Sequence, residues 1–498
     1  MSTAVPVAGN QDSSAPRRIL SRLFSFPVVI VGLLAVVAVL SVRTHCDDPD
    51  MWWHLKLGQI IWTTRTIPLS DLFSYTTNHQ ASIPQEWLAQ LTLYGAYKWA
   101  GYSGLMLWLC FFTTALLVAG YGLCVLYSGN AKVAFAGAMV IWLFATVGLA
   151  ARPQLIGYLL LIAELALIHL GRTRNPRWFF WLPLLFALWI NCHASFFFGL
   201  IVAGSILFAS LYSFQAGSLV APRWDPRCRR MLAMALVLAA AALFLNPDGI
   251  RQIQYPLDTL LHQPLGLSSV SEWKAPQFTD ARGVALLAVL LCIFLLVAIR
   301  RSELLLDEFQ LLAIGTWMAL THARMLFVFG ILAAPILSRQ LASAFPGHFT
   351  GKNRIWLNAM ILGASLMAIG WAFPGRQSLE KQVEMASPVK AVEFIKANHL
   401  AGPMLNDYVY GGYLIWAAPE YPVFVDGRAD VFEWTGVLEE YENWAALQND
   451  PNVLLQKYRI RFCLLNRQSA MVRVLPLLPE WKLVYADGNS VIFLRATN

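Results

Sequence analysis

Long apolar runs recur along most of the 498-residue chain, and they constrain its fold more than any other feature. Each run is about 16 to 24 residues long, close to the length that an α-helix needs to cross the hydrocarbon core of a bilayer. The expected fold class is therefore an α-helical polytopic membrane protein. About eleven transmembrane helices are predicted, at residues 26–42, 104–127, 132–150, 153–170, 177–192, 194–214, 231–246, 283–299, 308–322, 324–342 and 355–373.

The composition supports the same class of protein. Apolar residues make up 57% of the chain and charged residues only 13%, whereas soluble proteins have about 25% charged residues. The net charge of +8 comes from basic residues that concentrate in short loops between apolar runs, as orientation signals do. We therefore expect no nucleic-acid partner. The seven cysteines are scattered and show no metal-ligand spacing.

Basic residues also predict how the chain is inserted. A basic cluster precedes the first run, so residues 1–25 are expected to form a cytoplasmic N-terminal tail. Alternation of the spans then assigns two large loops, residues 43–103 and 247–282, and the C-terminal part of the chain to the extracytoplasmic side. Further basic loops are assigned to the cytoplasm, at residues 171–177, 221–230, 300–303 and 346–354.

Two stretches of the first large loop have the amphipathic spacing of surface helices. WWHLKLGQIIW, residues 52–62, combines apolar residues at helical spacing with Lys56 and Gln59. PQEWLAQLTLYGAYKWA, residues 84–100, ends before Gly101. We expect both stretches to form helices that lie along the membrane surface.

The C-terminal part has the patterning of a soluble α/β domain. Three short runs, PMLND, PVFVDG and RFCLLN, are predicted to be strands, and WKLVYADGNSVIFLR is predicted to form a hairpin around Asp487 and Gly488. Ser387 is expected to cap a helix that begins at Pro388. The predicted domains are the cytoplasmic tail 1–25, the transmembrane domain 26–375 with its loop 43–103, and the extracytoplasmic α/β domain 376–498.

Polar motifs gather where the predicted helices meet the extracytoplasmic side. They are DDPD (47–50), PQEW (84–87), ARPQ (151–154), NCHAS (191–195), NPDG (246–249) and THAR (321–324). Ionisable groups in membrane spans are costly and usually functional. The cytoplasmic turns carry basic residues but no comparable recurring set, so we interpret the motifs as parts of one site.

Each motif has a structural alternative when it is taken alone. Asp48 or Asp50 would serve as a helix N-cap before MWWHL. His193 would satisfy backbone carbonyls in a tight turn, and Arg152 and Arg324 would anchor helix ends to lipid headgroups. NPDG is a turn signal by itself. The face shared by all the motifs favours a functional site over these separate explanations.

The residue types indicate chemistry between an anionic lipid and a partner that carries hydroxyl groups. Arginine offers bidentate donors to phosphate. A carboxylate at the water boundary accepts a proton from an attacking hydroxyl. Together, these groups favour glycosyl transfer from a lipid phosphate.

These features resemble the membrane-embedded GT-C superfamily of glycosyltransferases, in particular the bacterial members that take sugars from polyprenyl-phosphate carriers. The resemblance covers about residues 17–345 and rests on the multi-span layout, the first loop with its two surface helices, and the acidic motif. The stretch DMWW, residues 50–53, looks like the family's acidic motif and aromatic-rich helix. Met51 stands where a second acid is expected, and Asp48 is placed to substitute for it. The α/β tail resembles periplasmic domains appended to several such enzymes.

The resemblance implies an inverting glycosyltransferase of the cell (inner) membrane, with a cytoplasmic N-terminus and a periplasmic C-terminal domain. Its partners would be a polyprenyl-phosphate-linked sugar donor and a glycan, lipid or protein acceptor. Asp50 would be the catalytic base, supported by Asp48. No metal ligand is assigned, and a divalent metal, Mg or Mn, stays an open alternative. The substrate-binding residues would be His54, Glu86, Arg152, His193 and Arg324.

Two other functions stay open, as does a non-catalytic role in assembly. A transporter or flippase of a lipid-linked or anionic substrate would place its polar residues near the bilayer midplane, on broken helices. A glycan polymerase or ligase would use the same type of donor with arginine-bearing loops between later spans. Arg251, Lys274 and Arg282 of the second large loop fit that alternative.

The stretch FVDGRADVF, residues 424–432, has two interpretations in the C-terminal domain. In the simpler one it is a turn in which Gly427 supplies backbone freedom and Arg428 pairs with a nearby acid. In the other, the loop overhangs the membrane site and binds the acceptor glycan together with the stretch NDY, residues 406–408.

Overall fold

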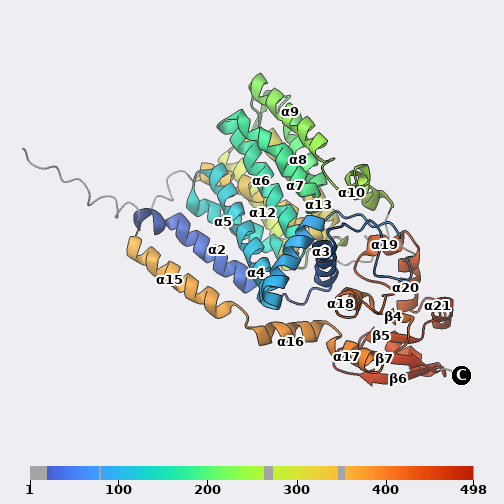
Figure 1. Cartoon of the computed structure of the whole chain (residues 1–498). Coiled ribbons are helices and arrows are strands. Elements are labelled where there is room, and N and C mark those ends of the chain that lie inside the picture. Colours follow the sequence, from blue (N-terminus) through green and yellow to red (C-terminus); the bar gives the residue numbers. More distant parts are fainter. Residues whose placement is uncertain (1–19, 78–79, 263–272, 346–353, 497–498) are drawn as a thin grey trace, which may run out of the picture.

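The computed structural model describes residues 20–77, 80–262, 273–345 and 354–496. A bundle of helices forms most of the molecule, and a small α/β domain is attached at one end of the bundle (Figure 1). Part of the predicted basic cluster, Arg17 and Arg18, lies outside the described residues. Most of the predicted basic loop 346–354 lies outside them as well. The side of the membrane that each end faces stays a prediction.

Every predicted apolar run overlaps a helix of the bundle. Among the described residues, five helical segments are long and apolar enough to cross a membrane, and shorter apolar helices accompany them. The mostly helical, apolar architecture is thus confirmed, while the count of eleven spans stays a prediction. The helices are α2 (Phe26–Val42), α4 (Trp87–Ser128), α5 (Ala131–Ala145), α6 (Gln154–Thr173), η1 (Pro176–Trp181) with α7 (Leu182–Ile190), α8 (Phe196–Ala209), α9 (Pro226–Ala242), α12 (Ala281–Arg300), α13 (Leu306–Thr321), α14 (Leu326–Ala344) and α15 (Ile355–Ala372).

The helix α14 is the centre of the bundle. Its residues are buried without interruption from Leu326 to Ser338, and it packs against α4, α5 and α13. A helix that is apolar on all sides is expected in such a central position. In contrast, α15 packs against α2 and exposes Trp356 and Trp371, so its outer face suits contact with lipid.

Loops that were predicted to share the cytoplasmic side do meet in space. The strands β1 (Phe214–Ala216), β2 (Leu219–Ala221) and β3 (Leu304–Leu305) form one small sheet, in which β2 and β3 are parallel. Arg172 forms a nearby ion pair with Asp307, with 2.7 Å between Nη1 and Oδ2. These loops therefore lie together at one end of the bundle.

The predicted loop 221–230 is shorter than expected. Residues 226–230 form the first turn of α9 instead. The reason is a strong start signal: the Asp225 side chain accepts a hydrogen bond from the backbone N–H of Cys228, and Pro226 occupies the first turn.

Both stretches predicted to be surface helices are helical, and their position along the membrane surface stays a prediction. The first is α3 (Met51–Thr64), and the second is the initial part of α4, which is kinked at Ala100 and Gly101. The two helices pack against each other beside the C-terminal domain (Figure 1). They form part of the surface on which that domain rests.

The C-terminal domain is built on a four-stranded mixed sheet of order β4-β5-β7-β6. The pair β4–β5 is parallel, and the predicted hairpin forms the antiparallel pair β6–β7. The strands are β4 (Met404–Asn406), β5 (Phe462–Asn466), β6 (Trp481–Ala486) and β7 (Ser490–Arg495). The helices are α16 (Arg376–Ala386), α17 (Val389–Ala397), η4 (Tyr408–Tyr410), α18 (Gly411–Ala417), α19 (Ala429–Glu433), α20 (Val437–Ala445), α21 (Pro451–Lys457) and α22 (Met471–Val474), with η5 (Leu475–Leu477).

Two local predictions for this domain are wrong. The run PVFVDG, residues 422–427, forms no strand in the described chain beyond a single bridge between Val423 and Ser74. The side chain of Asn406 replaces a strand partner, because its amide donates to the carbonyl of Val425 and accepts from the N–H of Phe424. The predicted helix begins at Val389, one residue later than expected.

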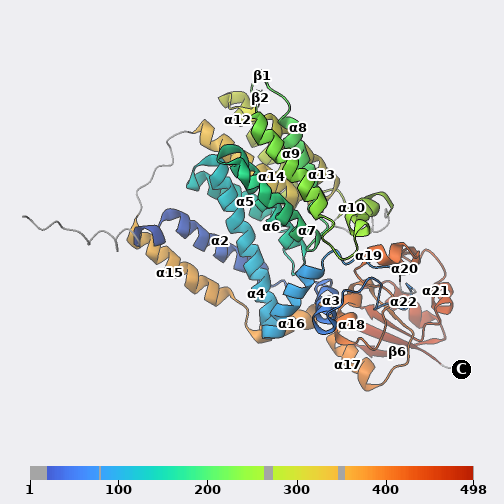
Figure 2. The ribbon, with the colours of Figure 1, turned by 45° about the horizontal axis from the view of Figure 1, so that its top comes forward.

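The first large loop reaches over the C-terminal domain. The N–H of Val423 donates to the carbonyl of Phe73, and the Thr76 hydroxyl donates to the carbonyl of Phe424 at 2.7 Å. From the other side, α10 (Ile250–His262) lies next to α19 in both views (Figure 2). The domain is thus held by two segments that are far apart in the sequence.

Candidate active site

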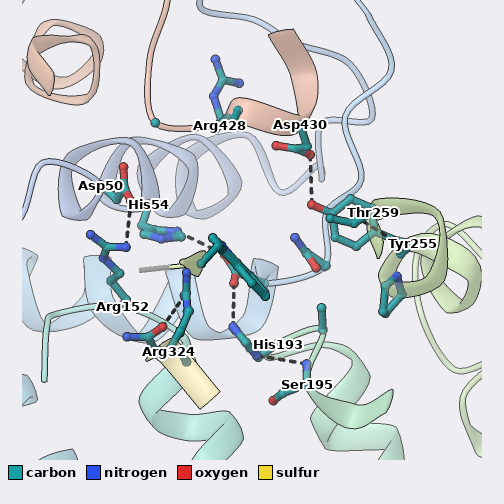
Figure 3. A pocket seen from close by; sticks show the side chains of 18 of the residues that line it. Asp50, His54, Arg152, His193, Ser195, Tyr255, Thr259, Arg324, Arg428 and Asp430 are labelled. Atoms are coloured by element: carbon teal, nitrogen blue, oxygen red, sulfur yellow. Dashed lines mark hydrogen bonds and ion pairs between the residues drawn. The ribbon is translucent and has the colours of Figure 1, made fainter. Parts of the chain in front are cut away.

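A cavity of about 520 Å³ lies between the end of the helical bundle and the C-terminal domain. Charged, aromatic and hydroxyl side chains point into it from several elements (Figure 3). Its lining comes from α3, the start of α4, the turns that precede α6, α8 and α14, the helix α10, and the 426–430 loop of the C-terminal domain. Concave sites with a few convergent polar groups are typical binding sites.

Asp50 and Arg152 line one wall of this cavity and form an ion-paired group with Asp48. Arg152 Nε lies 2.6 Å from Asp48 Oδ2, and Arg152 Nη1 lies 3.0 Å from Asp50 Oδ2. Asp48 Oδ1 also accepts the backbone N–H of Asp50 at 2.8 Å. Asp50 precedes α3 but its side chain makes no capping hydrogen bond. The N-cap interpretation therefore does not describe Asp50.

Two histidines face one glutamate in the next part of the wall. His54 Nδ1 lies 3.4 Å from Glu86 Oε2, and His193 Nε2 lies 3.5 Å from Glu86 Oε1. His193 Nδ1 accepts the backbone N–H of Ser195 at 3.1 Å. The hydrogen of a neutral His193 must therefore be on Nε2, which points it at Glu86.

Burial sets the ionisation of these groups. It raises the pKa of Asp50 to about 6, against the opposing effect of Arg152, and raises the pKa of Glu86 to about 8. Burial lowers the pKa of His193 to about 3, and the pKa of His54 also lies well below its usual value for the same reason. At neutral pH, Asp50 is mostly ionised, Glu86 mostly protonated, and both histidines are neutral.

A second guanidinium, that of Arg324, lines the same cavity near the first (Figure 3). Arg324 donates a hydrogen bond to the side-chain oxygen of Gln154, and it lies 5.7 Å from the ring centre of Trp273. Gln154 begins α6, two residues after Arg152, so the ARPQ turn positions both arginines. Two guanidinium groups around one cavity suit an anionic ligand with several oxygens, such as a phosphate.

The C-terminal domain supplies the remaining wall. Tyr255 of α10 donates to Asp430 Oδ2 at 3.0 Å, and both residues line the cavity (Figure 3). Arg428 forms ion pairs of 2.6 Å with Asp426 and with Asp71 of the first large loop. Two features expected for the 424–432 stretch are therefore present together: Arg428 pairs with nearby acids, and the loop overhangs the cavity.

Comparison with solved structures identifies the fold. The oligosaccharyltransferase of Archaeoglobus fulgidus, tethered with an acceptor peptide, matches with a TM-score of 0.56 and 13% identity, over 96% of this chain and 75% of that chain. ArnT from Cupriavidus metallidurans, bound to undecaprenyl phosphate, matches with a TM-score of 0.55 and 12% identity, over 94% and 97%. This chain has the GT-C fold.

A third protein of the GT-C fold is similar over a smaller part of its own length. The mycobacterial arabinofuranosyltransferase AftD matches with a TM-score of 0.51 and 14% identity, over 97% of this chain and 40% of that chain. No family model and no curated protein matches the sequence. At such low identities, it is the fold that is shared.

Six of the seven predicted site residues line the cavity of this GT-C fold. They are Asp50, His54, Glu86, Arg152, His193 and Arg324. Asp48 lies behind Arg152 and lines a smaller neighbouring cavity. The NPDG motif is not part of the lining, and its Asp248 instead lies 3.6 Å from Arg251. Within the described residues, no three His, Cys, Asp or Glu side chains are grouped as a metal site requires.

Several lining residues were missed by the sequence analysis. Tyr255 and Thr259 lie one turn apart on α10, and Thr259 donates to the carbonyl of Tyr255. Their i, i+4 spacing in the amphipathic segment IRQIQYPLDTLLH was the available signal. Tyr408 and Asp430 belong to the NDY and FVDGRADVF stretches, which the second interpretation of the C-terminal domain expected to overhang the site, and both line the cavity.

Proposed function

We propose that this protein is an inverting glycosyltransferase that moves a sugar from a polyprenyl-phosphate-linked donor to an extracytoplasmic glycan, lipid or protein acceptor. The observation that carries the proposal is the convergence of Asp50 with Arg152 and Arg324 on one cavity. A carboxylate can accept the proton of an acceptor hydroxyl, and two guanidinium groups can bind and stabilise a donor phosphate. The GT-C fold of the chain supports the same reaction class.

The reaction is a single displacement at the anomeric carbon. The acceptor oxygen forms the new bond to that carbon while its proton passes to the carboxylate of Asp50. The bond between the carbon and the phosphate oxygen breaks, and the phosphate leaves with the electron pair. Attack opposite to the leaving group inverts the configuration. Arg152 and Arg324 stabilise the charge that develops on the phosphate.

The ionisation of the other polar groups fits an anionic donor. Glu86 is mostly protonated at neutral pH, because burial raises its pKa to about 8. A second carboxylate charge beside the phosphate would repel it. The neutral His193, with its hydrogen on Nε2, adds a donor at the same wall without a net charge.

The position of the cavity favours transfer over transport. Its polar groups come from turns and surface helices at one end of the bundle and from the C-terminal domain. A transporter is expected to gather them on broken helices near the bilayer midplane. The resemblance to bacterial enzymes supports a location in the cell inner membrane, and the basic loops support a cytoplasmic N-terminus and a periplasmic C-terminal domain.

The test is transfer from a polyprenyl-phosphate sugar by purified Asp50→Asn protein in a single turnover. Asparagine keeps the size of the side chain but does not accept the proton, so turnover should fall by about 100-fold or more. Binding of polyprenyl phosphate should persist, because the two arginines are unchanged. Transfer at a near-normal rate by a folded variant would refute the role of Asp50.

A further inference from the structure

A glycine of the C-terminal domain lies directly against the carboxylate of Asp50. Gly427 belongs to the 426–430 loop, which lines the cavity beside the start of α3. A β-carbon built on Gly427 falls 1.8 Å from Asp50 Oδ1 and 2.9 Å from Asp50 Cγ. Real β-carbons essentially never approach other atoms within 3.0 Å. A side chain at position 427 therefore requires the Asp50 carboxylate or the loop to shift.

The two oxygens of Asp50 have different neighbours. Oδ2 pairs with Nη1 of Arg152, which belongs to the helical bundle. Oδ1 faces the backbone of Gly427, which belongs to the C-terminal domain. The carboxylate is thus fixed between the two parts of the molecule, although 20% of the side chain stays exposed towards the cavity.

The Gly427 loop is itself held from both directions. Arg428 joins the loop to the buried carboxylate of Asp71, and Tyr255 of α10 joins it to the bundle through Asp430. A second close approach occurs at Gly412, where a β-carbon would fall 2.1 Å from the carbonyl oxygen of Pro49. The C-terminal domain therefore meets the turn that carries Asp50 through its backbone at two points.

We propose that Gly427 is a positioning residue for Asp50 and that the C-terminal domain is thereby an integral part of the transfer site. This proposal rests on the proposed role of Asp50 as the base. A base has to lie within hydrogen-bond reach of the proton that it removes. The backbone of Gly427 limits the orientations of the carboxylate, which keeps it aimed at the incoming hydroxyl.

The first experiment compares Gly427→Ala with the full-length wild-type protein. The added methyl group displaces the carboxylate or the loop, and misplacement by about 1 Å can lower turnover by about 100-fold. We expect kcat to fall by about this factor while the KM for the polyprenyl-phosphate sugar changes little. The acid limb of the pH profile should move to lower pH, because a displaced loop admits water, which favours the carboxylate form of Asp50.

The matched control is Gly488→Ala in the same domain. A β-carbon at Gly488 meets nothing within 4 Å, so this variant should keep the wild-type kcat and pH profile. Wild-type turnover by Gly427→Ala would overturn the proposal. A loss of turnover with an unchanged acid limb would overturn it too, because that result indicates general damage to the fold.

A double-mutant cycle on thermal stability tests the proposed contact even if Gly427→Ala folds poorly. Thermal unfolding is measured for Gly427→Ala, for Asp50→Ala and for the double variant. We expect the methyl group at position 427 to destabilise the protein less when Asp50 is alanine, because the carboxylate that it would clash with is then absent. An equal loss in both backgrounds would overturn the proposed contact. The cycle is independent of catalysis, so normal transfer by Asp50→Asn would refute the proposed function separately.

Discussion

Asp50 combines a buried environment with an arginine partner, and this combination determines when it can act as a base. Burial raises its pKa to about 6 even though Arg152 opposes that change. The carboxylate form, which accepts a proton, is lost as the pH falls through this value. Glu86, whose pKa burial raises to about 8, gains a charge as the pH rises through that value.

These two values predict a bell-shaped pH dependence of transfer. The value of kcat/KM should be highest between about pH 6 and 8, with the acid limb due to Asp50 and the alkaline limb due to Glu86. Steady-state transfer across the pH range measures it. Glu86→Gln should remove the alkaline limb and keep the acid limb. A rate that is constant through about pH 6 would contradict the assignment of Asp50.

At the scale of single residues, the sequence predicted which polar side chains gather at the candidate cavity but not how they pair with one another. Asp50, Glu86, Arg152, His193 and Arg324 could be predicted because each is a polar residue at the end of an apolar run. Their pairing could not, because it depends on the packing angles of helices that are up to about 270 residues apart in the chain. The same limit explains why the contact of Gly427 with Asp50 left no trace in the local pattern.

The link between elements that matters most for the site is the buried ion pair of Arg428 with Asp71 and Asp426. The side chains of both acids are fully buried, and that of Arg428 is only 5% exposed. Burial opposes the ionisation of Asp71, but Arg428 and the hydroxyl groups of Ser74 and Thr77 outweigh it and lower its pKa to about 2. The pair thus contributes stability above about pH 4, which is lost as the pH falls towards 2.

Arg428→Ala should therefore be strongly destabilising. It leaves two carboxylates buried without their cation, which typically costs about 3–5 kcal/mol. Thermal unfolding of the purified protein measures the loss. The control is Arg495→Ala, which removes an exposed ion pair with Glu480 in the same domain and should cost about 0–1 kcal/mol. Similar losses for the two variants would show that the buried group does not hold the domain.

The contact between α10 and α19 should affect substrate binding more than stability. Tyr255→Phe removes the hydroxyl that donates to Asp430 at 3.0 Å but keeps the ring. Without this bond the 426–430 loop is less well fixed at the cavity wall, so we expect the KM for donor or acceptor to rise, by no more than the about 5- to 30-fold that corresponds to one hydrogen bond of about 1–2 kcal/mol. Steady-state kinetics with both substrates test this. Tyr212→Phe, at an exposed position on the bundle, serves as the control, and equal KM values for both variants would contradict the prediction.

Elements of regular structure were predicted well where one local pattern decides them. The β6–β7 hairpin follows from Asp487 and Gly488, and the helices follow from apolar runs. The strand expected at 422–427 was wrong because a side chain, Asn406, takes the hydrogen bonds that a neighbouring strand would take. A single side chain acting across the domain cannot be recognised from the pattern of the strand itself.

For the whole molecule, the basic loops predict that both the cavity and the C-terminal domain lie outside the cytoplasm. A reporter enzyme that is active only in the cytoplasm should be silent when it is fused after residue 496. The same reporter should be active when fused within the 221–225 loop, at the end of the bundle that carries β1 to β3. The reverse pattern would overturn the orientation. The fold alone does not determine it, because a helical bundle has the same internal packing in either direction.

The division of the cavity between the first large loop and the C-terminal domain has a consequence for biosynthesis. Asp50 is synthesised early, whereas Gly427 and Asp430, which complete its surroundings, leave the ribosome nearly 400 residues later. The nascent chain therefore carries the proposed base long before the pocket around it exists. The proposed lipid donor meets a complete site only after the C-terminal domain has folded, so chains truncated before this domain are expected to be inactive.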